Sequence, residues 1–151
     1  GCSRNGSDRR ARWWRRAEWE RVDEQDARTL VIVLPGVAPD EAGRVSGCIQ
    51  YSEETDPDYL SAAVDIFVGT AAQGRGVGPD AMRTLIAWLF DERGHHRLTV
   101  DPAADNARAI HVYGQLGFRR VGVMRRYERG ADGTWHDGLL MELLAEELVR
   151  A

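Results

Sequence analysis

The hexapeptide Gln73-Gly74-Arg75-Gly76-Val77-Gly78 is the stretch of the sequence best suited to binding a ligand. It follows a predicted strand, residues 65–69, and opens a predicted helix. Backbone N–H groups and the positive end of a helix dipole then meet at one point, which favours a phosphate ligand. Glycine suits such a turn because a Cβ would keep a phosphate oxygen from the amides, and because some positions need a positive φ.

The glycine spacing fits neither common phosphate-binding pattern. A P-loop requires a lysine, which the sequence lacks entirely, and the dinucleotide pattern requires Gly-x-Gly-x-x-Gly rather than glycines at alternate positions. Taken alone, the turn is equally compatible with a plain connection between a strand and a helix.

Asp65 has a chemical signature of its own, because it lies in the middle of an apolar predicted strand, residues 62–69. Burying a carboxylate in such a strand costs free energy unless the group is paired or solvated, so we expect Asp65 to face a cleft. Its ordinary pKa of ~3.9 lies about 6 units below that of an alkylammonium group, so direct proton transfer is uphill by roughly 8 kcal/mol. Asp65 is therefore suited to orienting an ammonium group, and a second role as base stays open.

Other carboxylates could share this cleft. They are Glu53, Glu54, Asp56 and Asp58, which precede the strand, and Asp101, which ends a neighbouring one. If they converge, they would suit a cationic molecule with several ammonium groups. The alternative is that residues 53–58 form a solvated loop.

Hydrophobic periodicity predicts the elements that position these residues. The apolar stripe Met82, Leu85, Ile86, Leu89 and Phe90 has helical spacing. We predict a second helix from Asp105, as N-cap, to about Leu116, where Gly117 ends it, and an N-terminal helix over residues 8–26 with tryptophan anchors. Strands are predicted at residues 29–34, 44–51, 62–69, 97–100, 118–128 and 135–143, the last two joined by a hairpin turn.

Two linked motifs resemble those of the GNAT superfamily of N-acetyltransferases. The hexapeptide resembles the family's Gln/Arg-x-x-Gly-x-Gly/Ala signature, and Asn106, Ala109, Tyr113 and Gly117-Phe118 resemble its second motif. The resemblance covers roughly residues 31–151. It implies an α/β (α+β) three-layer GNAT fold with a mixed, mostly antiparallel central sheet, splayed at the acetyl-CoA site, and helices on both faces.

The resemblance also implies roles for individual residues. The amides of Gln73 to Gly78 would hold the pyrophosphate of acetyl-CoA, Asn106 would bond the pantetheine arm, and Tyr113 would protonate the departing sulfur. A backbone N–H near Phe67 or Val68 would bind the oxyanion, within the coenzyme-contacting stretch Ile66, Phe67 and Val68. Without the family pattern, Tyr113 would be interpreted as a core-packing tyrosine.

A closer resemblance concerns the acceptor. Glu-Glu-Thr-Asp-Pro before a strand with a central Asp, then Asp-Pro-x-x-x-Asn-x-Arg-Ala-Ile-x-x-Tyr-x-x-x-Gly-Phe, is similar to aminoglycoside 6'-N-acetyltransferases. The resemblance implies that Asp65 and Asp101 bind the amines of the drug, that Glu53, Glu54 and Asp56 form its acidic loop, and that Tyr113 is the acid. The family's first strand and helix find no clear match here.

The resulting expectation is an acetyl-CoA-dependent N-acetyltransferase that acetylates a primary amine of a polycationic small molecule, namely the 6'-amine of an aminoglycoside. It would act by direct attack in a ternary complex, with a role in antibiotic resistance. The alternatives are another acceptor, namely a siderophore precursor, a polyamine or a protein N-terminus, or a non-catalytic module that binds acyl-CoA.

Length and composition limit the remaining possibilities. The 151 residues suit a single domain, 1–151, with an atypical N-terminus, and no apolar run approaches a membrane span. Two cysteines suggest a reducing cytoplasm. The net charge is −4, with +4 in residues 1–21 and −8 in the rest, which argues against a nucleic-acid partner. We expect a monomer or homodimer, no metal, and His95 and His96 on the surface.

Overall fold

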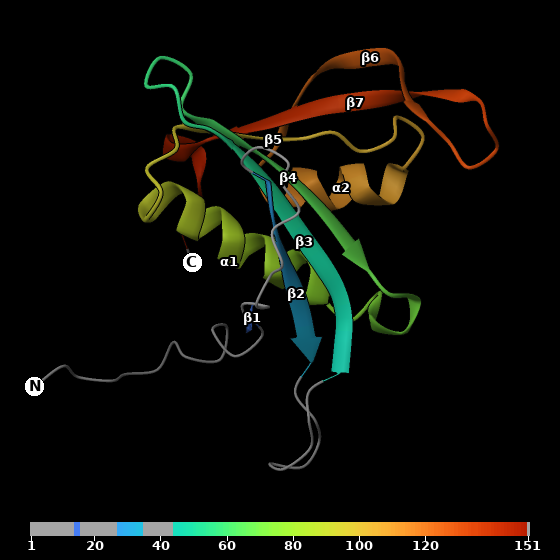
Figure 1. The fold of residues 1–151 in the computed structure, drawn as a ribbon, viewed down its shortest axis with the longest axis horizontal. Coiled ribbons are helices and arrows are strands. Elements are labelled where there is room, and N and C mark those ends of the chain that lie inside the picture. The colour runs from blue at the N-terminus through green and yellow to red at the C-terminus, as the bar shows by residue number, and fades with distance from the viewer. Residues whose placement is uncertain (1–13, 16–26, 35–43, 151) are drawn as a thin grey trace, which may run out of the picture.

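A seven-stranded sheet forms the body of the protein (Figure 1). The structure is a computed structural model that describes residues 14–15, 27–34 and 44–150. The strands are β1 (Trp14–Arg15), β2 (Ala27–Leu34), β3 (Arg44–Glu54), β4 (Ser61–Val68), β5 (Arg97–Val100), β6 (Arg119–Arg129) and β7 (Trp135–Leu144), and the α-helices are α1 (Val77–Asp91) and α2 (Ala107–Gln115). Short 3-10 turns occupy Thr70–Ala72 and Ala145–Glu147.

The strand order is β1-β2-β3-β4-β5-β7-β6, and every neighbouring pair except β4 and β5 is antiparallel. This confirms the prediction of a mixed, mostly antiparallel sheet. None of the helices in the described ranges is long and apolar enough to cross a membrane.

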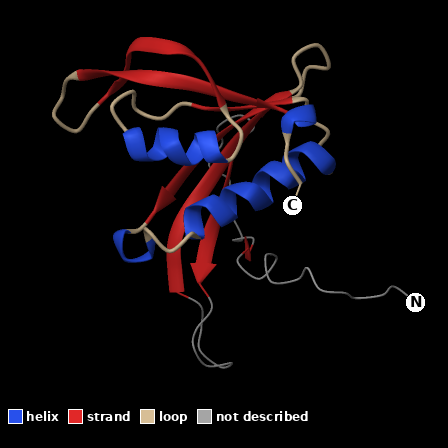
Figure 2. Cartoon of the chain, turned by 180° about the vertical axis from the view of Figure 1, so that it is seen from behind, coloured by secondary structure: helices blue, strands red, loops and turns tan. Residues whose placement is uncertain are grey.

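The hydrophobic core lies on one face of this sheet, under both helices (Figure 2). The predicted stripe of α1 is buried: Met82, Leu85, Ile86, Leu89 and Phe90. It packs on inward-facing residues of β3, β4 and β5 such as Ile49, Val64 and Leu98, and α2 joins the same cluster through Ile110 and Tyr113. The two described helices therefore form one layer rather than two.

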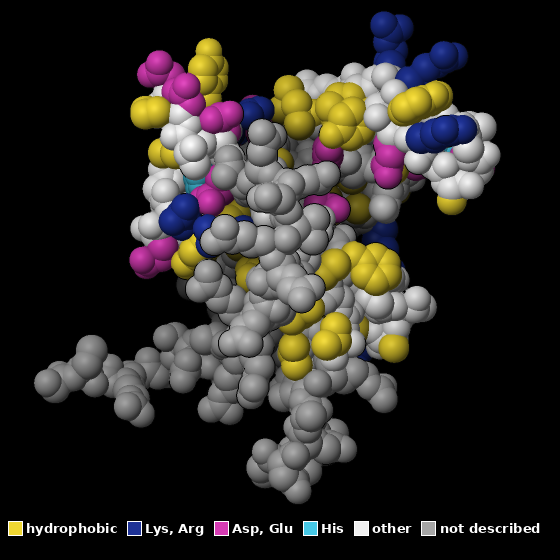
Figure 3. Space-filling model, viewed as in Figure 1, with side chains coloured by type: hydrophobic (Ala, Val, Ile, Leu, Met, Phe, Trp, Pro, Cys, Tyr) yellow, Lys and Arg dark blue, Asp and Glu magenta, His cyan; other side chains and the backbone are white. Residues whose placement is uncertain are grey.

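The opposite face carries no helix among the described residues, and hydrophobic side chains are exposed on it (Figure 3). Phe67 of β4 is 66% exposed there. The helix predicted for residues 8–26 lies outside the described residues except at Trp14 and Arg15, where the prediction is wrong. These two residues form β1, which pairs with Val31 and Ile32. The pairing gives hydrogen-bond partners to backbone groups on the outer edge of β2.

The pairing of β4 with β5 is short. Only Ser61, Ala62 and Ala63 pair with β5, opposite Arg97 to Thr99, although β4 continues for five residues to Val68. Beyond this point the two parallel strands part, and each is followed by a helix, α1 after β4 and α2 after β5. The sheet therefore opens at the carboxyl ends of its two parallel strands, where α/β proteins commonly bind ligands.

Gly47 lies where the backbones of β3 and the carboxyl end of β4 come very close. A Cβ at this position would lie 2.2 Å from the carbonyl oxygen of Phe67. We expect Gly47→Ala to lower the free energy of unfolding by about 1–3 kcal/mol, since the backbone must move to admit the methyl group. Urea unfolding measures this. Gly114→Ala is the control: it lies in α2 with no atom near its Cβ position, and should raise stability by about 0.5–1 kcal/mol. Equal stability of both variants would contradict the close approach.

Candidate functional site

The glycine turn leaves its backbone amides uncapped. Gly74 and Gly76 have φ values of 73° and 76°, and a Cβ on either would meet no atom within 4 Å. Glycine is therefore required by the left-handed backbone rather than by crowding. Gly76 is the N-cap of α1 and makes no side-chain capping bond, so the first N–H groups of the helix have no partner of that kind. This geometry fits the predicted anion site.

The Gln73 side chain connects the glycine turn to β4 and to α2. Its Nε2 donates to the carbonyl oxygen of Val68 at 2.9 Å, and its Oε1 accepts from Arg108 Nη1 at 3.2 Å. The residue predicted to contact a coenzyme therefore joins the end of β4 to the first turn of α2. Arg108 stood in the quoted motif without an assigned role.

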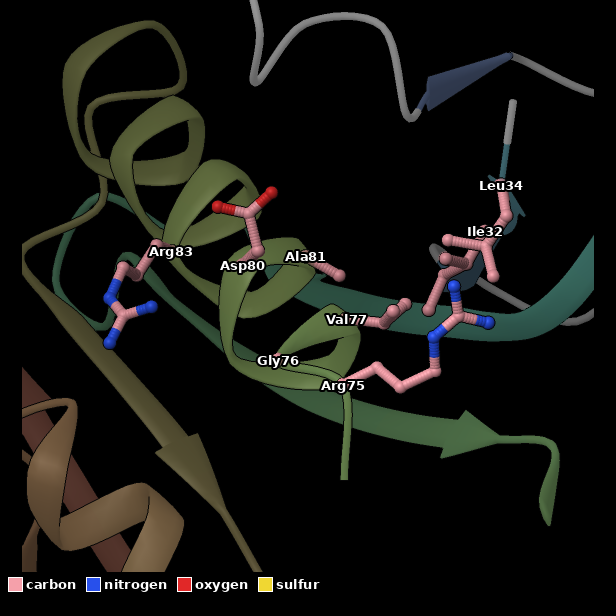
Figure 4. A pocket seen from close by; sticks show the side chains of 8 residues that line it. All are labelled: Ile32, Leu34, Arg75, Gly76, Val77, Asp80, Ala81 and Arg83. Carbon is pink, nitrogen blue, oxygen red and sulfur yellow. The ribbon is translucent and has the colours of Figure 1, made fainter. Parts of the chain in front are cut away.

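The Arg75 side chain points away from α2. It runs past Val77 toward Ile32 and lines a hollow of about 310 Å³ between β2 and the start of α1 (Figure 4). The Arg75 side chain therefore lies away from the glycine turn, and the residue offers its backbone amide there.

Tyr113 is held in the core by α2. The helix begins after Asn106, whose Oδ1 accepts from the Ala109 amide at 3.1 Å. Asn106 is therefore the N-cap and the prediction of Asp105 is wrong, because the residue that bonds the third helical amide lies one position later. The Tyr113 ring is buried and meets Phe118 edge-on, with ring centroids 5.9 Å apart. Gly117 ends the helix as predicted, with a φ of 102°.

Two predicted acceptor residues act electrostatically on Tyr113. Burial, followed by the negative charges of Asp65 and Asp101, raises the pKa of the Tyr113 phenol to about 12. Asp65 lies on the exposed face of β4, and its Oδ1 accepts from the Ile66 amide at 2.8 Å, in the part of the strand that has parted from β5. Asp65 and Asp101 therefore lie near enough for their charges to act on the Tyr113 phenol, although the three residues come from different segments.

Asp101 has a partner that sequence reasoning missed. The hydroxyl of Tyr127 in β6 donates to Asp101 Oδ2 at 2.5 Å. This hydrogen bond, then burial and the Asp101 charge, raises the pKa of Tyr127. No local pattern in the sequence signals the pair, since it depends on how β6 bends.

The acidic loop lies at the other end of β4. Asp65 is four residues, roughly 13 Å, along the strand from Ser61. Glu54 and Asp56 are exposed and accept from amides of their own loop, at Asp56 and Asp58 respectively, both at 2.9 Å. The structure does not bring this loop together with Asp65 and Asp101.

Glu53 is placed inside the protein, with its side chain only 6% exposed. It accepts from Arg93 Nε at 2.9 Å and contacts His95 Nε2 at 2.8 Å. The prediction that His95 lies on the surface is wrong, because the ring is buried against this carboxylate. The geometry gives Glu53 a structural role in joining β3 to the segment after α1.

Comparison with known proteins identifies the family. The model of the acetyltransferase (GNAT) family matches residues 3–118. The chain belongs to the GNAT family. The predicted family is thereby confirmed.

Several curated GNAT relatives share about a third of their aligned residues with this chain. An aminoglycoside N(6')-acetyltransferase type 1 of Klebsiella pneumoniae is 35% identical over 80 residues, 52% of this chain and 39% of that enzyme. A kanamycin resistance protein of Rhizobium radiobacter is 35% identical over 75 residues, 49% of this chain and 68% of that protein. An N-alpha-acetyltransferase RimI of Mycobacterium tuberculosis is 41% identical over 78 residues, 50% of this chain and 47% of that enzyme.

Solved structures of GNAT proteins share the fold. A ribosomal-protein-S5-alanine acetyltransferase of Vibrio fischeri superimposes with a TM-score of 0.70 at 22% identity, over 82% of this chain and 64% of that one. A mutant of the spermidine N-acetyltransferase SpeG of Vibrio cholerae gives a TM-score of 0.69 at 20% identity, over 83% of this chain and 68% of that one. The predicted GNAT fold, with its mixed and mostly antiparallel sheet, is confirmed, whereas the helices within the described ranges cover one face of the sheet instead of the predicted two.

The residues present fit the acetyl-CoA that GNAT proteins use. The uncapped amides after Gly74 and Gly76 suit a pyrophosphate, and the parted strands leave backbone groups of β4 without a partner on β5. The Ile66 amide already donates to Asp65, so a ligand that uses it must displace that carboxylate.

Glu53→Gln tests the structural role of Glu53. Burial raises the pKa of this carboxyl, but hydrogen bonds from Arg93 and His95 outweigh it, so its pKa lies below the ordinary 4.5. The stabilisation is therefore present above pH 4.5 and is lost as the pH falls through the lowered value. We expect the variant to lose about 2–4 kcal/mol at neutral pH, and the difference from the wild type to shrink in acid.

Urea unfolding at a series of pH values measures this difference. Glu54→Gln is the matched control, since Glu54 is the exposed neighbour and should change stability little. If the two variants behave alike, the buried cluster does not stabilise the fold.

Proposed function

We propose that the protein transfers the acetyl group of acetyl-CoA to a primary amine of a polycationic small molecule, with the 6'-amine of an aminoglycoside as the first candidate. The observation that supports this proposal is that the charges of Asp65 and Asp101 act on the Tyr113 phenol, in a fold where β4 parts from β5 and the glycine turn is uncapped. The aminoglycoside relatives support the acceptor class. The two cysteines of the sequence are compatible with a reducing cytoplasm, where we propose that the enzyme works.

Backbone groups would hold the coenzyme. The amides of Gly74 to Gly78 would receive its pyrophosphate, the stretch of β4 at Phe67 and Val68 would lie along its acyl end, and Asn106 would offer its amide nitrogen, since its oxygen caps α2. When bound, acetyl-CoA supplies an activated acetyl group as a thioester with a thiolate leaving group.

Asp65 and Asp101 would bind the ammonium form of the acceptor. Their charges favour the protonated amine, which must lose its proton before it attacks. Because a carboxylate is a far weaker base than an alkylamine, the proton would pass to water, or the reaction would draw on the fraction of amine that is already neutral. A polycationic acceptor suits this arrangement, since one ammonium group can stay bound while another reacts.

Tyr113 would donate its Oη proton to the leaving thiolate. With a pKa of about 12 it is fully protonated at neutral pH, but it releases that proton reluctantly. A cation bound between Asp65 and Asp101 offsets their charges and so lowers the Tyr113 pKa. Acceptor binding would therefore prepare the acid.

We expect Tyr113→Phe to lower kcat by about 10²–10⁴-fold, because a positioned acid is lost while the ring still packs on Phe118. Steady-state kinetics with acetyl-CoA measure kcat, and calorimetry should find unchanged affinity for acetyl-CoA. Full activity of the variant would remove Tyr113 from the chemistry. Coenzyme binding without turnover by the wild type would favour the non-catalytic acyl-CoA module.

Asp65→Asn and Asp101→Asn should each weaken acceptor binding by about 1.5–3 kcal/mol, the size of a hydrogen bond to a charged group. The measurement is KM for each amine in a panel of kanamycin, tobramycin, spermidine and a peptide amine. Asp56→Asn makes the same charge change in the acidic loop and tells whether that loop also binds the acceptor. An unchanged KM in both site variants would contradict the acceptor assignment.

The same panel separates the candidate acceptors. Turnover of spermidine alone would favour a polyamine, in line with the spermidine acetyltransferase fold, and turnover of the peptide alone would favour a protein N-terminus, in line with the RimI relative. In either case the aminoglycoside is excluded as the acceptor.

A further inference from the structure

A β-bulge in β6 directs the Tyr127 side chain toward Asp101. Met124 pairs with Gly138 and Glu128 with His136, so β6 advances four residues where β7 advances two. Within the bulge, Arg126 adopts a φ of 51°, and among the described residues it is the one non-glycine with a positive φ. Its amide donates to Asp137 Oδ1 at 2.8 Å, which replaces the ladder bond that the bulge removes.

β7 makes room for the Tyr127 ring. A Cβ at Gly138 would lie 2.8 Å from Tyr127 Cδ1 and 3.2 Å from Met124 Cε, so the ring lies directly over the glycine. An arginine in the left-handed region of φ and a glycine inside a strand are both unfavourable. Such features persist only where the surrounding structure requires them. Bulges of this kind commonly redirect one side chain beside a functional site.

The loop that carries Asp101 is fixed to the same strand. The Leu139 amide donates to the Pro102 carbonyl at 2.8 Å, and Ala103 bridges to Gly138. Tyr127, which is 49% exposed, reaches this loop from the bulge and donates to Asp101 Oδ2. The hydrogen bond engages one carboxylate oxygen, Oδ2, and thereby restricts the rotation of the Asp101 carboxylate.

We propose that Tyr127 is a positioning residue of the acceptor site, which holds the Asp101 carboxylate in its cation-binding orientation, and that the bulge in β6 places it there. This inference rests on the proposed function. Without the hydroxyl, the carboxylate can rotate away from the acceptor, whereas the coenzyme site on the glycine turn is untouched.

Tyr127→Phe in the full chain tests the inference, because it removes the hydroxyl and keeps the ring over Gly138. We expect KM for kanamycin or spermidine to rise about tenfold, the scale of one lost hydrogen bond to a charged group, with kcat and acetyl-CoA affinity nearly unchanged. In an Asp101→Asn background the same substitution should change KM less than about twofold, since the two residues act as one unit. Gly138→Ala, which displaces the ring, should raise KM in the same way.

Tyr59→Phe is the matched control, because Tyr59 is 69% exposed in the loop before β4. If Asp101→Asn raises KM but Tyr127→Phe behaves like Tyr59→Phe, the positioning role is overturned and the proposed function stands. An equal effect of Tyr127→Phe with and without Asp101 also overturns it. If the wild type acetylates no amine, the proposed function falls and the inference falls with it.

Discussion

The parting of β4 from β5 is the constraint on which the rest of the structure depends. A parallel pair that breaks after three residues leaves backbone donors and acceptors exposed in the middle of a sheet, and such groups need a partner. The molecule supplies some partners itself, with Asp65 on the Ile66 amide and Gln73 on the Val68 carbonyl. The remaining groups lie along the unpaired part of β4, which leads to the uncapped start of α1.

The charges of Asp65 and Asp101 would have two opposing effects in the proposed reaction. They would attract a cationic acceptor, but they would also favour the protonated amine, and they raise the pKa of Tyr113. A bound cation would offset these charges and so reduce both unfavourable effects at once. The arrangement would therefore suit acceptors that carry more than one positive group.

Local patterns allowed most of the fold to be predicted, together with the elements that carry the candidate site. The α1 stripe, the alternation of β4 and the glycine turn could be predicted because each depends on neighbours in sequence. The second motif pointed to Tyr113, which the structure brings near Asp65 and Asp101. The Glu53–His95 contact and the Tyr127–Asp101 bond were missed because they join residues 42 and 26 positions apart. The first pair depends on where the segment after α1 meets β3, and the second depends on the bulge in β6. No periodicity in the sequence encodes either feature.

Gln73 joins two elements with a single amide group, which is bonded to Val68 at the end of β4 and to Arg108 in α2. The separation of these two residues is therefore limited by the length of one side-chain amide and two hydrogen bonds. A molecule that inserts between them has to break one of these bonds, so ligand entry at this point would loosen the link between the strand and the helix.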